Sequence, residues 1–449
     1  MDAFQRYEAA CRYINEGLIR TGDAPGSDRT RREWMESFLP DLDHPERSFE
    51  AIHVAGTSGK GSVATMVAEI LHAAGIRAAL HVSPYLQVAT EKLWAEGRYA
   101  SAEEFSGLVD WIRPRAEARR GEEVPMHGMA SVGLALEFFR RRAVALGVME
   151  AGVGGRSDLT NVMRTRVAVV SALGLDHVKT LGPELRDIAW HKAGVIRAGC
   201  VAVVLPSCPE IVDAARGQAR EVGAELRLLA RDRFGGRVDD RGRTRLTYRG
   251  ERLALDDVPL GMRGLFQAEN AALAVAAVEA AGHGVDPDAV TEGLARARLP
   301  GRLELIPPSE RNPCPVLLDG AHNPDKLGAM LSGLLTLRRR RLHVVYGAIG
   351  SRSPDRELRR LAGLADTLVV TEPAVYQKTA RPAEEILQVV RGETRALVER
   401  NALDAVAEAL GQAEPDDLVA VTGSLYLCGE ARERFYPARE VVERRCSWW

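Results

Sequence analysis

The amino-acid sequence predicts an α/β protein, with a doubly wound parallel sheet in its first part and a second, smaller α/β unit after it. Short apolar runs alternate with segments of helical periodicity along most of the 449 residues, which is typical of parallel sheets covered by helices. The first apolar run leads into a glycine-rich turn, HVAGTSGKGS at 53–62. A proline-containing stretch, LPGRLELIPP at 299–308, comes before the alternation restarts. These observations predict two domains, residues 1–298 and 299–449.

Composition and charge narrow the class of protein. The chain is 46% hydrophobic and 27% charged, which is ordinary for a globular protein. Its formal net charge of −2 argues against a protein that coats nucleic acid, and no apolar run approaches the roughly 20 residues that span a bilayer. The six cysteines are scattered without a C-x-x-C pair, which fits a reducing compartment. We therefore expect a cytoplasmic monomer with neither a nucleic-acid nor a membrane partner.

The first elements form a β-α-β unit around the glycine-rich turn. Residues 51–55 are expected to form a buried strand, 62–75 a helix and 76–82 the next strand. The turn departs twice from the common G-x-x-x-x-G-K-[ST] pattern, because Val54 stands at its first glycine and Gly61 follows the lysine. Its place between a strand and a helix nevertheless favours phosphate binding over a glycine-rich turn without a ligand.

A phosphate-binding loop at this turn has a physical basis. Glycines let the backbone approach phosphate oxygens closely, and the following helix directs its N–H groups at them. A lysine adds positive charge over the β- and γ-phosphates. The residues expected to hold the phosphates are Gly56, Thr57, Ser58, Gly59, Lys60, Gly61 and Ser62. We therefore interpret the first domain as a P-loop ATPase domain.

The alternation continues to about residue 282. The elements expected after the first unit are a helix at 131–145, strands at 145–150 and 167–173, a helix at 184–199, a strand at 200–206 and a helix at 266–282. Between the last two, residues 224–262 contain short segments and many glycine and aspartate turns. That composition predicts a small antiparallel patch within the first domain.

Several polar residues stand where the strands end, and the carboxyl ends of parallel strands form the ligand edge of such sheets. Ser83 follows the second strand, although a turn serine is the simpler interpretation. Glu150 precedes the loop AGVGGRSDLTNV, and a carboxylate there suits Mg²⁺ beside a triphosphate; a dinucleotide fingerprint is the weaker alternative for GVGG. His177 is either a ligand or a structural histidine. Lys192 lies on a helix, where an ion-paired surface lysine is the simple alternative.

The second domain repeats the alternation on a smaller scale. Strands are expected in CPVLLDGAH, LHVVYGAIG and TLVVTEP, and a helix in NPDKLGAMLSGLLTL. Asp319 and His322 follow the first of these strands, and Arg302 lies at the junction of the domains, a favoured position for ligand sites. A guanidinium there neutralises phosphate charge. Taken singly these residues have structural explanations as good as functional ones, and their joint order along the chain decides between the two.

That order is carried by nine segments: HVAGTSGKGS, SPYL, EAGVGGRSDLTNV, GLDHVKTLG, KAGV, FQAENAALA, PGRLE, LDGAHNP and TGSLYL. Together, from about residue 51 to residue 430, they resemble the folylpolyglutamate synthase and dihydrofolate synthase family of the Mur ligase superfamily. The resemblance implies a P-loop ATPase domain followed by a Rossmann-like ligase domain.

The resemblance also implies an activity. Members of this family are ATP-dependent ligases, in which a carboxylate attacks the γ-phosphate to give an acyl phosphate, and the amine of L-glutamate then displaces phosphate to form an amide. Dihydropteroate or a folate is the implied acid, which places the chain in folate biosynthesis and one-carbon metabolism. A related ligase that joins a non-folate acid to an amino acid is the alternative. A nucleotide-binding module without ligase activity is a third interpretation.

Roles for individual residues follow from the resemblance. It implies ATP and two Mg²⁺ ions as cofactors, with K⁺ as a further candidate. The implied catalytic residues are Lys60, His177 and Lys192. The implied metal ligands are Ser83, Glu150, His177 and Lys192, the last as a carbamate. The implied nucleotide contacts outside the phosphate loop are Asn270 at the adenine and Arg302, Asp319 and His322 on the second domain.

Departures from the family pattern gather on the acceptor side. The segment PMHGMAS at 125–131 lacks the phenylalanine and glutamate that the family carries there, and Leu159 stands where alanine is usual. After SPYL, the stretch QVATEKLWAEGRYAS replaces the usual arginine-rich run. Within the phosphate loop only Ser58 differs, since asparagine is usual at that place. The sequence therefore predicts the nucleotide chemistry more firmly than the acceptor.

Overall fold

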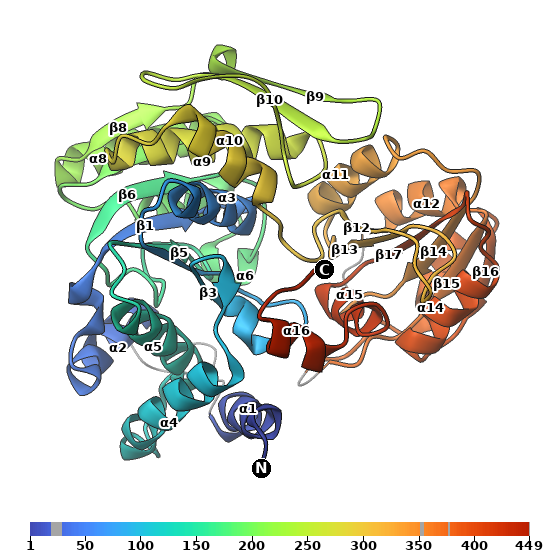
Figure 1. Ribbon diagram of the computed structural model, residues 1–449, viewed down its shortest axis with the longest axis horizontal. Helices are drawn as coiled ribbons and strands as arrows, with labels where there is room; N and C mark the ends of the chain where they lie inside the picture. The colour runs from blue at the N-terminus through green and yellow to red at the C-terminus, as the bar shows by residue number, and fades with distance from the viewer. Residues whose placement is uncertain (19–28, 351–353, 376–377, 449) are drawn as a thin grey trace.

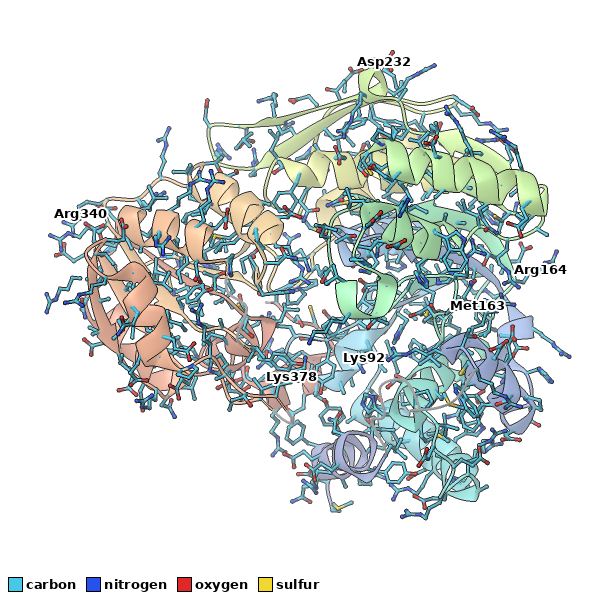
Figure 2. The ribbon with its side chains drawn as sticks, turned by 180° about the vertical axis from the view of Figure 1, so that it is seen from behind. Lys92, Met163, Arg164, Asp232, Arg340 and Lys378 are labelled. Atoms are coloured by element: carbon cyan, nitrogen blue, oxygen red, sulfur yellow. The ribbon has the colours of Figure 1, made fainter. Side chains whose placement is uncertain are left out.

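The computed structural model describes residues 1–18, 29–350, 354–375 and 378–448. Within these residues the strands form sheets of eight, three and six strands. We call the part with the first two sheets the N-terminal lobe and the part with the third the C-terminal lobe, and the two lie side by side (Figure 1). In the reverse view of Figure 2, Lys92 of the N-terminal lobe and Lys378 of the C-terminal lobe lie near the boundary between them.

The largest sheet is mainly parallel. In spatial order its strands are β4 (Arg98–Tyr99), β3 (Leu93–Ala95), β2 (Ala78–His81), β5 (Leu146–Glu150), β1 (Glu50–Ala55), β6 (Thr165–Val170), β7 (Val201–Val204) and β8 (Glu225–Leu228). The six strands from β2 to β8 in this order pair in parallel, and only β3 and β4 at one edge are antiparallel. The chain segments that leave β5, β1 and β6 therefore meet at one edge of the sheet.

Helices cover both faces of this sheet. The helices of the lobe are α1 (Ala3–Arg12), α2 (Arg31–Phe38), α3 (Lys60–Ala73), α4 (Ala102–Ala118), α5 (Met126–Arg141), α6 (Val178–Leu181), α7 (Leu185–Ala193), α8 (Pro209–Val222), α9 (Phe266–Ala281) and α10 (Pro287–Arg296), with short helical segments η1 (Tyr13–Gly17), η2 (Leu39–Leu42), η3 (Pro45–Ser48), η4 (Ala89–Lys92) and η5 (Arg231–Arg233). Along β6, Val167 and Val169 pack into the core shared with α3 and α9, whereas Ala168 and Val170 pack against α7 and α8. Successive side chains of a strand point to opposite faces. Because both faces of β6 are buried, the strand must be apolar without interruption. The predicted doubly wound sheet is confirmed.

The range 224–262 divides differently from the expectation. Its first strand, β8, pairs in parallel with β7, because α8 carries the chain back across the sheet before β8 begins. The rest forms an antiparallel sheet in which β10 (Thr244–Arg249) lies between β9 (Phe234–Val238) and β11 (Ala254–Pro259). The expected antiparallel patch therefore corresponds to residues 234–259, and its extension to residue 224 was wrong.

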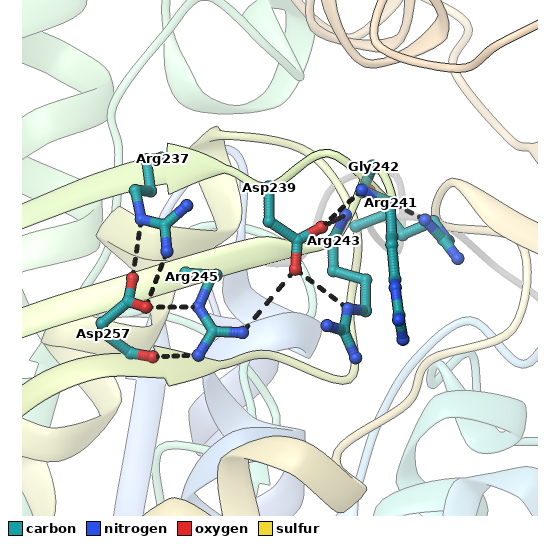
Figure 3. A network of polar contacts seen from close by, with 8 residues as sticks. Arg237, Asp239, Arg241, Gly242, Arg243, Arg245 and Asp257 are labelled. Atoms are coloured by element: carbon teal, nitrogen blue, oxygen red, sulfur yellow. Dashed lines mark hydrogen bonds and ion pairs between the residues drawn. The ribbon is translucent and has the colours of Figure 1, made fainter.

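Charged side chains brace the three-stranded sheet on its solvent side (Figure 3). Asp257 accepts hydrogen bonds from Arg237, at 2.7 and 2.6 Å, and from Arg245 at 2.8 Å. Asp239 accepts the backbone N–H of Arg243 at 2.9 Å, and this bond is the largest of the interactions that lower the pKa of Asp239 to about 2. Solvent screens ion pairs of this kind, so they contribute little to stability and mainly fix the turn.

The C-terminal lobe repeats the layered arrangement. Its strands, in spatial order, are β12 (Glu304–Ile306), β13 (Val316–Asp319), β17 (Leu418–Thr422), β14 (Leu342–Tyr346), β15 (Thr367–Val370) and β16 (Arg395–Val398). All pair in parallel except β12. The helices are α11 (Pro324–Leu334), α12 (Asp355–Leu364), α13 (Ala383–Val390), α14 (Ala402–Gly411), α15 (Leu425–Arg432) and α16 (Ala438–Arg444). The helices α11 to α13 pack on one face and α14 and α15 on the other, which confirms the predicted Rossmann-like unit.

A buried arginine joins the two lobes. Arg432 donates to Glu304 at 3.0 Å, to Gln87 of the N-terminal lobe at 2.9 Å and to the carbonyl of Ser447. The Ser447 hydroxyl donates to Glu91 at 3.1 Å, so the segment after α16 lies between the lobes (Figure 1). These partners satisfy a guanidinium that would otherwise be costly to bury.

No helix of the described residues is long and apolar enough to cross a membrane.

Candidate active site

The glycine-rich turn between β1 and α3 forms a tight loop whose shape depends on missing side chains. Gly59 has a φ of +85°, and a Cβ there would overlap with Oδ1 of Asn270. At Gly56, with a φ of +148°, a Cβ would overlap with the Ser171 hydroxyl. Any other residue at these positions is both strained and sterically blocked. The loop therefore leads directly into the first turn of α3, whose N–H groups have no partners within the helix.

Backbone and hydroxyl groups from the loop after β6 brace this turn. The amides of Thr57 and Ser58 both donate to the carbonyl of Ala172, at 2.8 and 3.3 Å. The Ser171 hydroxyl donates to the carbonyl of Ser58 at 2.7 Å. The Thr57 hydroxyl donates to the carbonyl of Gly174 at 2.9 Å. The phosphate loop is thus held in place before any ligand arrives.

Two lysines converge on the carbonyl oxygen of Gly56. Lys60 Nζ donates to it at 3.1 Å and Lys192 Nζ at 2.6 Å. Lys192 is 2% exposed, so the simple interpretation as a surface lysine does not hold. Burial lowers the pKa of Lys192 to about 7, and the positive charge of Lys60 acts in the same direction. A buried amine near neutrality can exist without its proton, whereas an ordinary lysine cannot.

Glu150 ends β5 beside the phosphate loop. Its Oε2 accepts the backbone N–H of Ser83 at 2.9 Å, and a Cβ on Gly61 would lie 3.4 Å from that oxygen. Burial raises the pKa of Glu150, and the positive charges of Lys60, Arg302 and Lys326 oppose the rise. The structure therefore brings two of the predicted metal ligands, Ser83 and Glu150, into contact beside Gly61.

His177 is more exposed than the other predicted metal ligands. It has a φ of +52° at the N-terminus of α6, and its side chain is 49% exposed. Partial burial lowers its pKa; Asp176 opposes this shift, and Lys60, Lys192 and Lys326 reinforce it. The histidine is therefore within electrostatic range of the site and is disposed to be neutral, as a metal ligand must be.

Asn270, predicted to meet the adenine, lies on α9 against the phosphate loop. Its amide donates to Gln267 at 2.9 Å, and Gln267 in turn donates to the Ser62 hydroxyl at 3.2 Å. Gln267 was not among the predicted residues, although it stands in the segment FQAENAALA three positions earlier. The pair connects α9 to the second half of the loop, at Gly59 and Ser62.

The C-terminal lobe brings its own polar groups toward the loop. Asp319 accepts the backbone N–H groups of Leu303 and Ala321, at 2.8 and 2.9 Å, so here it shapes the turn that carries Arg302. His322 makes a 2.8 Å hydrogen bond with the carbonyl of Gly320, and burial lowers its pKa to about 4.

Lys326 is a residue of the site that our residue-by-residue assignment missed. Its Nζ lies 3.3 Å from Asp176 Oδ2 across the boundary between the lobes and 3.3 Å from Nε2 of His322. The available signal was its position four residues after His322, in the first turn of α11. Together with Lys60, Lys192 and Arg302, it surrounds Glu150 and the phosphate loop with positive charge.

The donor set suits Mg²⁺ better than a transition metal. The described residues contain no cluster of three or more His, Cys, Asp and Glu side chains, and the predicted ligands include only Glu150 and His177 of these types. Mg²⁺ typically takes one or two carboxylates and completes its shell with water and phosphate oxygens. A buried carboxylate beside a phosphate loop meets that requirement.

The first testable consequence concerns Gly59. We expect Gly59→Ala to weaken ATP binding at least about tenfold, because a left-handed alanine costs about 1–2 kcal/mol and the overlap with Asn270 pushes the loop away from its ligand. Calorimetric titration with ATP measures the change. Gly75→Ala is the matched control, since Gly75 has a φ of +71° in open space and should leave ATP affinity unchanged. Equal ATP affinity in both variants would contradict this account of the loop.

Comparison with known protein sequences places the chain among glutamate ligases. Residues 301–425 match the family described as Mur ligase, glutamate ligase domain. The chain is 32% identical over 448 residues to the dihydrofolate synthase/folylpolyglutamate synthase of Mycobacterium tuberculosis, covering 89% of each chain. It is 29% identical over 450 residues to the protein of that name from Bacillus subtilis, covering 96% of this chain and 99% of the relative.

Solved structures agree with the sequence relatives. The folylpolyglutamate synthase of Mycobacterium tuberculosis complexed with ADP superposes with a TM-score of 0.84 at 27% identity, covering 97% of this chain and 99% of the other. A folylpolyglutamate synthase complex with AMPPCP and folate superposes with a TM-score of 0.78 at 26% identity, covering 96% and 99%. The shared architecture extends over both lobes.

Proposed function

The chain belongs to the folylpolyglutamate synthase and dihydrofolate synthase family, and on that premise we propose that its site between the lobes joins L-glutamate to dihydropteroate or to a folate. The chain is an ATP-dependent ligase of the Mur type. The relatives favour a folate-type acid over the alternative of a non-folate acid.

One observation supports the proposal most strongly. The phosphate loop, the two lysines on the Gly56 carbonyl and the Glu150 carboxylate lie together at the carboxyl ends of β1, β5 and β6, and Arg302 and Lys326 of the C-terminal lobe act on the same carboxylate. Such a concentration of positive charge around a buried carboxylate suits a triphosphate and its metal ion. In this proposal the two lobes lie on opposite sides of the reacting phosphoryl group.

In the first step the acid's carboxylate attacks the γ-phosphate of ATP, and ADP leaves. We propose that the loop at residues 56–62 holds the β- and γ-phosphates through the N–H groups at the start of α3, and that Lys60 and Arg302 offset the charge that develops as the phosphoryl group transfers. Asn270 contacts the adenine in this proposal. Asp319 and His322 contact the nucleotide from the C-terminal lobe.

In the second step the amine of L-glutamate attacks the acyl phosphate, and phosphate leaves as the amide forms. The acyl phosphate is prone to hydrolysis, so the lobes must exclude water while it exists. The ion pair between Lys326 and Asp176, at 3.3 Å, spans the boundary between the lobes beside the phosphate loop. We propose that this pair helps to hold the lobes together during the reaction.

We propose that Ser83, Glu150 and His177 hold one Mg²⁺ ion and that Lys192 carries a carbamate that holds a second. When bound, Mg²⁺ offsets the charge on the transferring phosphoryl group. Lys192 fits the modification because its amine is buried next to Lys60, whose positive charge would pair with an anionic carbamate. K⁺ is a further candidate cofactor without an assigned site.

The remaining proposals concern the enzyme as a whole. We propose a boundary between the two functional domains at residues 298/299, just before the PGRLE segment that carries Arg302. We also propose that the enzyme acts as a cytoplasmic monomer without a nucleic-acid partner. The proposed catalytic groups all come from one chain, and the net charge of −2 gives little attraction for nucleic acid.

The proposed function predicts strict coupling between ATP turnover and both partners. ADP release measured with dihydropteroate or tetrahydrofolate and L-glutamate should equal amide formation, and omission of either partner should abolish amide formation and sustained ADP release. Unrelated aromatic acids serve as controls for the acceptor. ADP release that is equally fast without acid and amine would contradict the ligase assignment. Turnover with a non-pterin acid alone would contradict the folate assignment.

A further inference from the structure

Residues 83–91, which we call the connecting segment, follow β2 and join the phosphate-binding side of the site to the boundary between the lobes. The first of them, Ser83, donates a hydrogen bond from its backbone N–H to Glu150 at 2.9 Å. The last, Glu91, is 5% exposed and accepts two backbone N–H groups of the segment, at 2.8 and 3.0 Å. Hydrogen bonds to a buried carboxylate are strong, so they hold the segment in one conformation.

The C-terminal lobe binds the middle of the connecting segment through the side chain of Gln87. Its Oε1 accepts a hydrogen bond from Arg432 at 2.9 Å. Its Nε2 donates to Oε2 of Glu433 at 2.6 Å and to the carbonyl of Tyr436 at 2.7 Å. These partners lie at the end of α15 and directly after it. An amide can accept from a guanidinium and donate to a carboxylate at once, so Gln87 suits a place between charges of both signs.

Close packing reinforces this contact. Gly429 of α15 lies so near the connecting segment that a Cβ there would overlap with the carbonyl oxygen of Leu86. Gly301, in the turn before β12, has a φ of +68°, and a Cβ on it would lie 2.9 Å from Cδ1 of Leu86. Two glycines therefore let the chain approach Leu86 from the other side of the boundary, and they leave the segment little room to shift.

The guanidinium that binds Gln87 also contacts the turn that carries Arg302. Arg432 donates from Nε to Glu304 at 3.0 Å, and Glu304 accepts the backbone N–H of Gly301 at 2.9 Å. Arg302 stands between these last two residues in the chain. One buried guanidinium therefore connects the connecting segment with the Arg302 turn, and each of the two brings a polar group toward Glu150.

We propose that Gln87 is a positioning residue for phosphoryl transfer. Through its contact with Arg432, it fixes the distance between Ser83 and Arg302 when the lobes are together. This inference rests on the proposed function, in which Ser83 and Glu150 hold Mg²⁺ and Arg302 offsets charge on the same phosphoryl group. A displacement of about 1 Å between such groups can lower a rate about a hundredfold. Gln87 itself contacts neither the substrates nor the metal ion.

The test replaces Gln87 by methionine, which has a similar length and cannot form the three hydrogen bonds. We expect kcat to fall about tenfold to a hundredfold, with the KM for dihydropteroate nearly unchanged, because the acid does not contact this side chain. Thermal melting shows whether the variant folds. If it melts below the assay temperature, Gln87→Glu serves in its place, since it keeps an acceptor for Arg432 and sets a negative charge against Glu433; kcat should fall in the same range.

Two further measurements separate positioning from a merely structural contact. Calorimetric titration of Mg²⁺ into enzyme saturated with a non-hydrolysable ATP analogue should show an affinity at least about fivefold lower in Gln87→Met, within the range of coupling between sites. In an Arg302→Met background, Gln87→Met should lower kcat less than about threefold, because the group to be positioned is gone. Equal losses of kcat in both backgrounds would overturn the inference.

Gln412→Met is the matched control. Gln412 is also partly buried, and its side chain donates to Glu408 at 2.7 Å within the C-terminal lobe. Its replacement should leave kcat and the Mg²⁺ affinity unchanged. If Gln87→Met lowers only the melting temperature, the inference is wrong while the proposed function stands. If the wild-type enzyme does not couple ATP turnover to amide formation, the proposed function fails and the inference fails with it.

Discussion

Replacing Lys60 by methionine is expected to lower kcat by about a thousandfold. Removal of a single group that stabilises developing charge typically costs about 10²–10³ in kcat, and Lys60 combines that role with neutralising the bound triphosphate. In the structure Lys60 Nζ donates a hydrogen bond to the Gly56 carbonyl at 3.1 Å. The side chain can turn from this carbonyl to a phosphate oxygen without rearranging the loop. Steady-state turnover, measured as ADP release in the presence of acid and glutamate, reports the loss.

The control for this experiment is another lysine close in sequence to the site. Lys179 is exposed on α6, two residues after His177, and Lys179→Met should keep near wild-type kcat. Melting temperatures of both variants should stay close to that of the wild type, because Lys60 is only partly buried and Lys179 is exposed. A Lys60→Met enzyme that retains a tenth or more of its kcat would refute the assignment of this lysine to phosphoryl transfer.

Lys192→Ala is the second large effect, expected to lower kcat by about 10²–10³, in line with the loss of a group that stabilises transferring charge. The expected result differs from that of Lys60 because a small carboxylate, such as formate or acetate, should partly restore activity. Such an acid can occupy the space that the side chain leaves and supply the missing anion. No such rescue is expected for Lys60→Met, where the missing group is a cation.

Two measurements separate the carbamate from a purely structural lysine. Mass spectrometry of the native protein under CO₂ should show a labile addition of one carboxyl group that Lys192→Ala lacks. The Mg²⁺ concentration needed for half-maximal activity should also rise in the variant. Full activity of Lys192→Ala, or loss of activity with no response to small carboxylates or Mg²⁺, would count against the carbamate.

The phosphate loop was predictable because its signal is local. Residues 53–62 carry the strand end, the glycines and the lysine in one continuous stretch, and the conformation they need is determined by neighbours in sequence. The alternation of apolar runs likewise predicted both sheets, since strands buried on both faces must be apolar throughout. The same reasoning failed for β8, because four residues in a range rich in turns do not reveal which strand they will pair with.

The tertiary structure changed the interpretation of individual residues. Lys192 looked like a surface lysine from its helix alone, and it is buried because α7 packs its side chain toward Gly56. Lys326 and Asp176 are 150 positions apart and became a pair only when the lobes met.

The sequence by itself therefore determined the fold class, the phosphate loop and the class of chemistry, because each depends on residues that are close together along the chain or on the order of several such groups. Only the tertiary structure decided which cations surround Glu150 and how deeply Lys192 is buried. These features depend on burial and on contacts between segments that are distant along the chain. Burial changes the pKa of a lysine or a glutamate, because it removes the water that would stabilise the charged form.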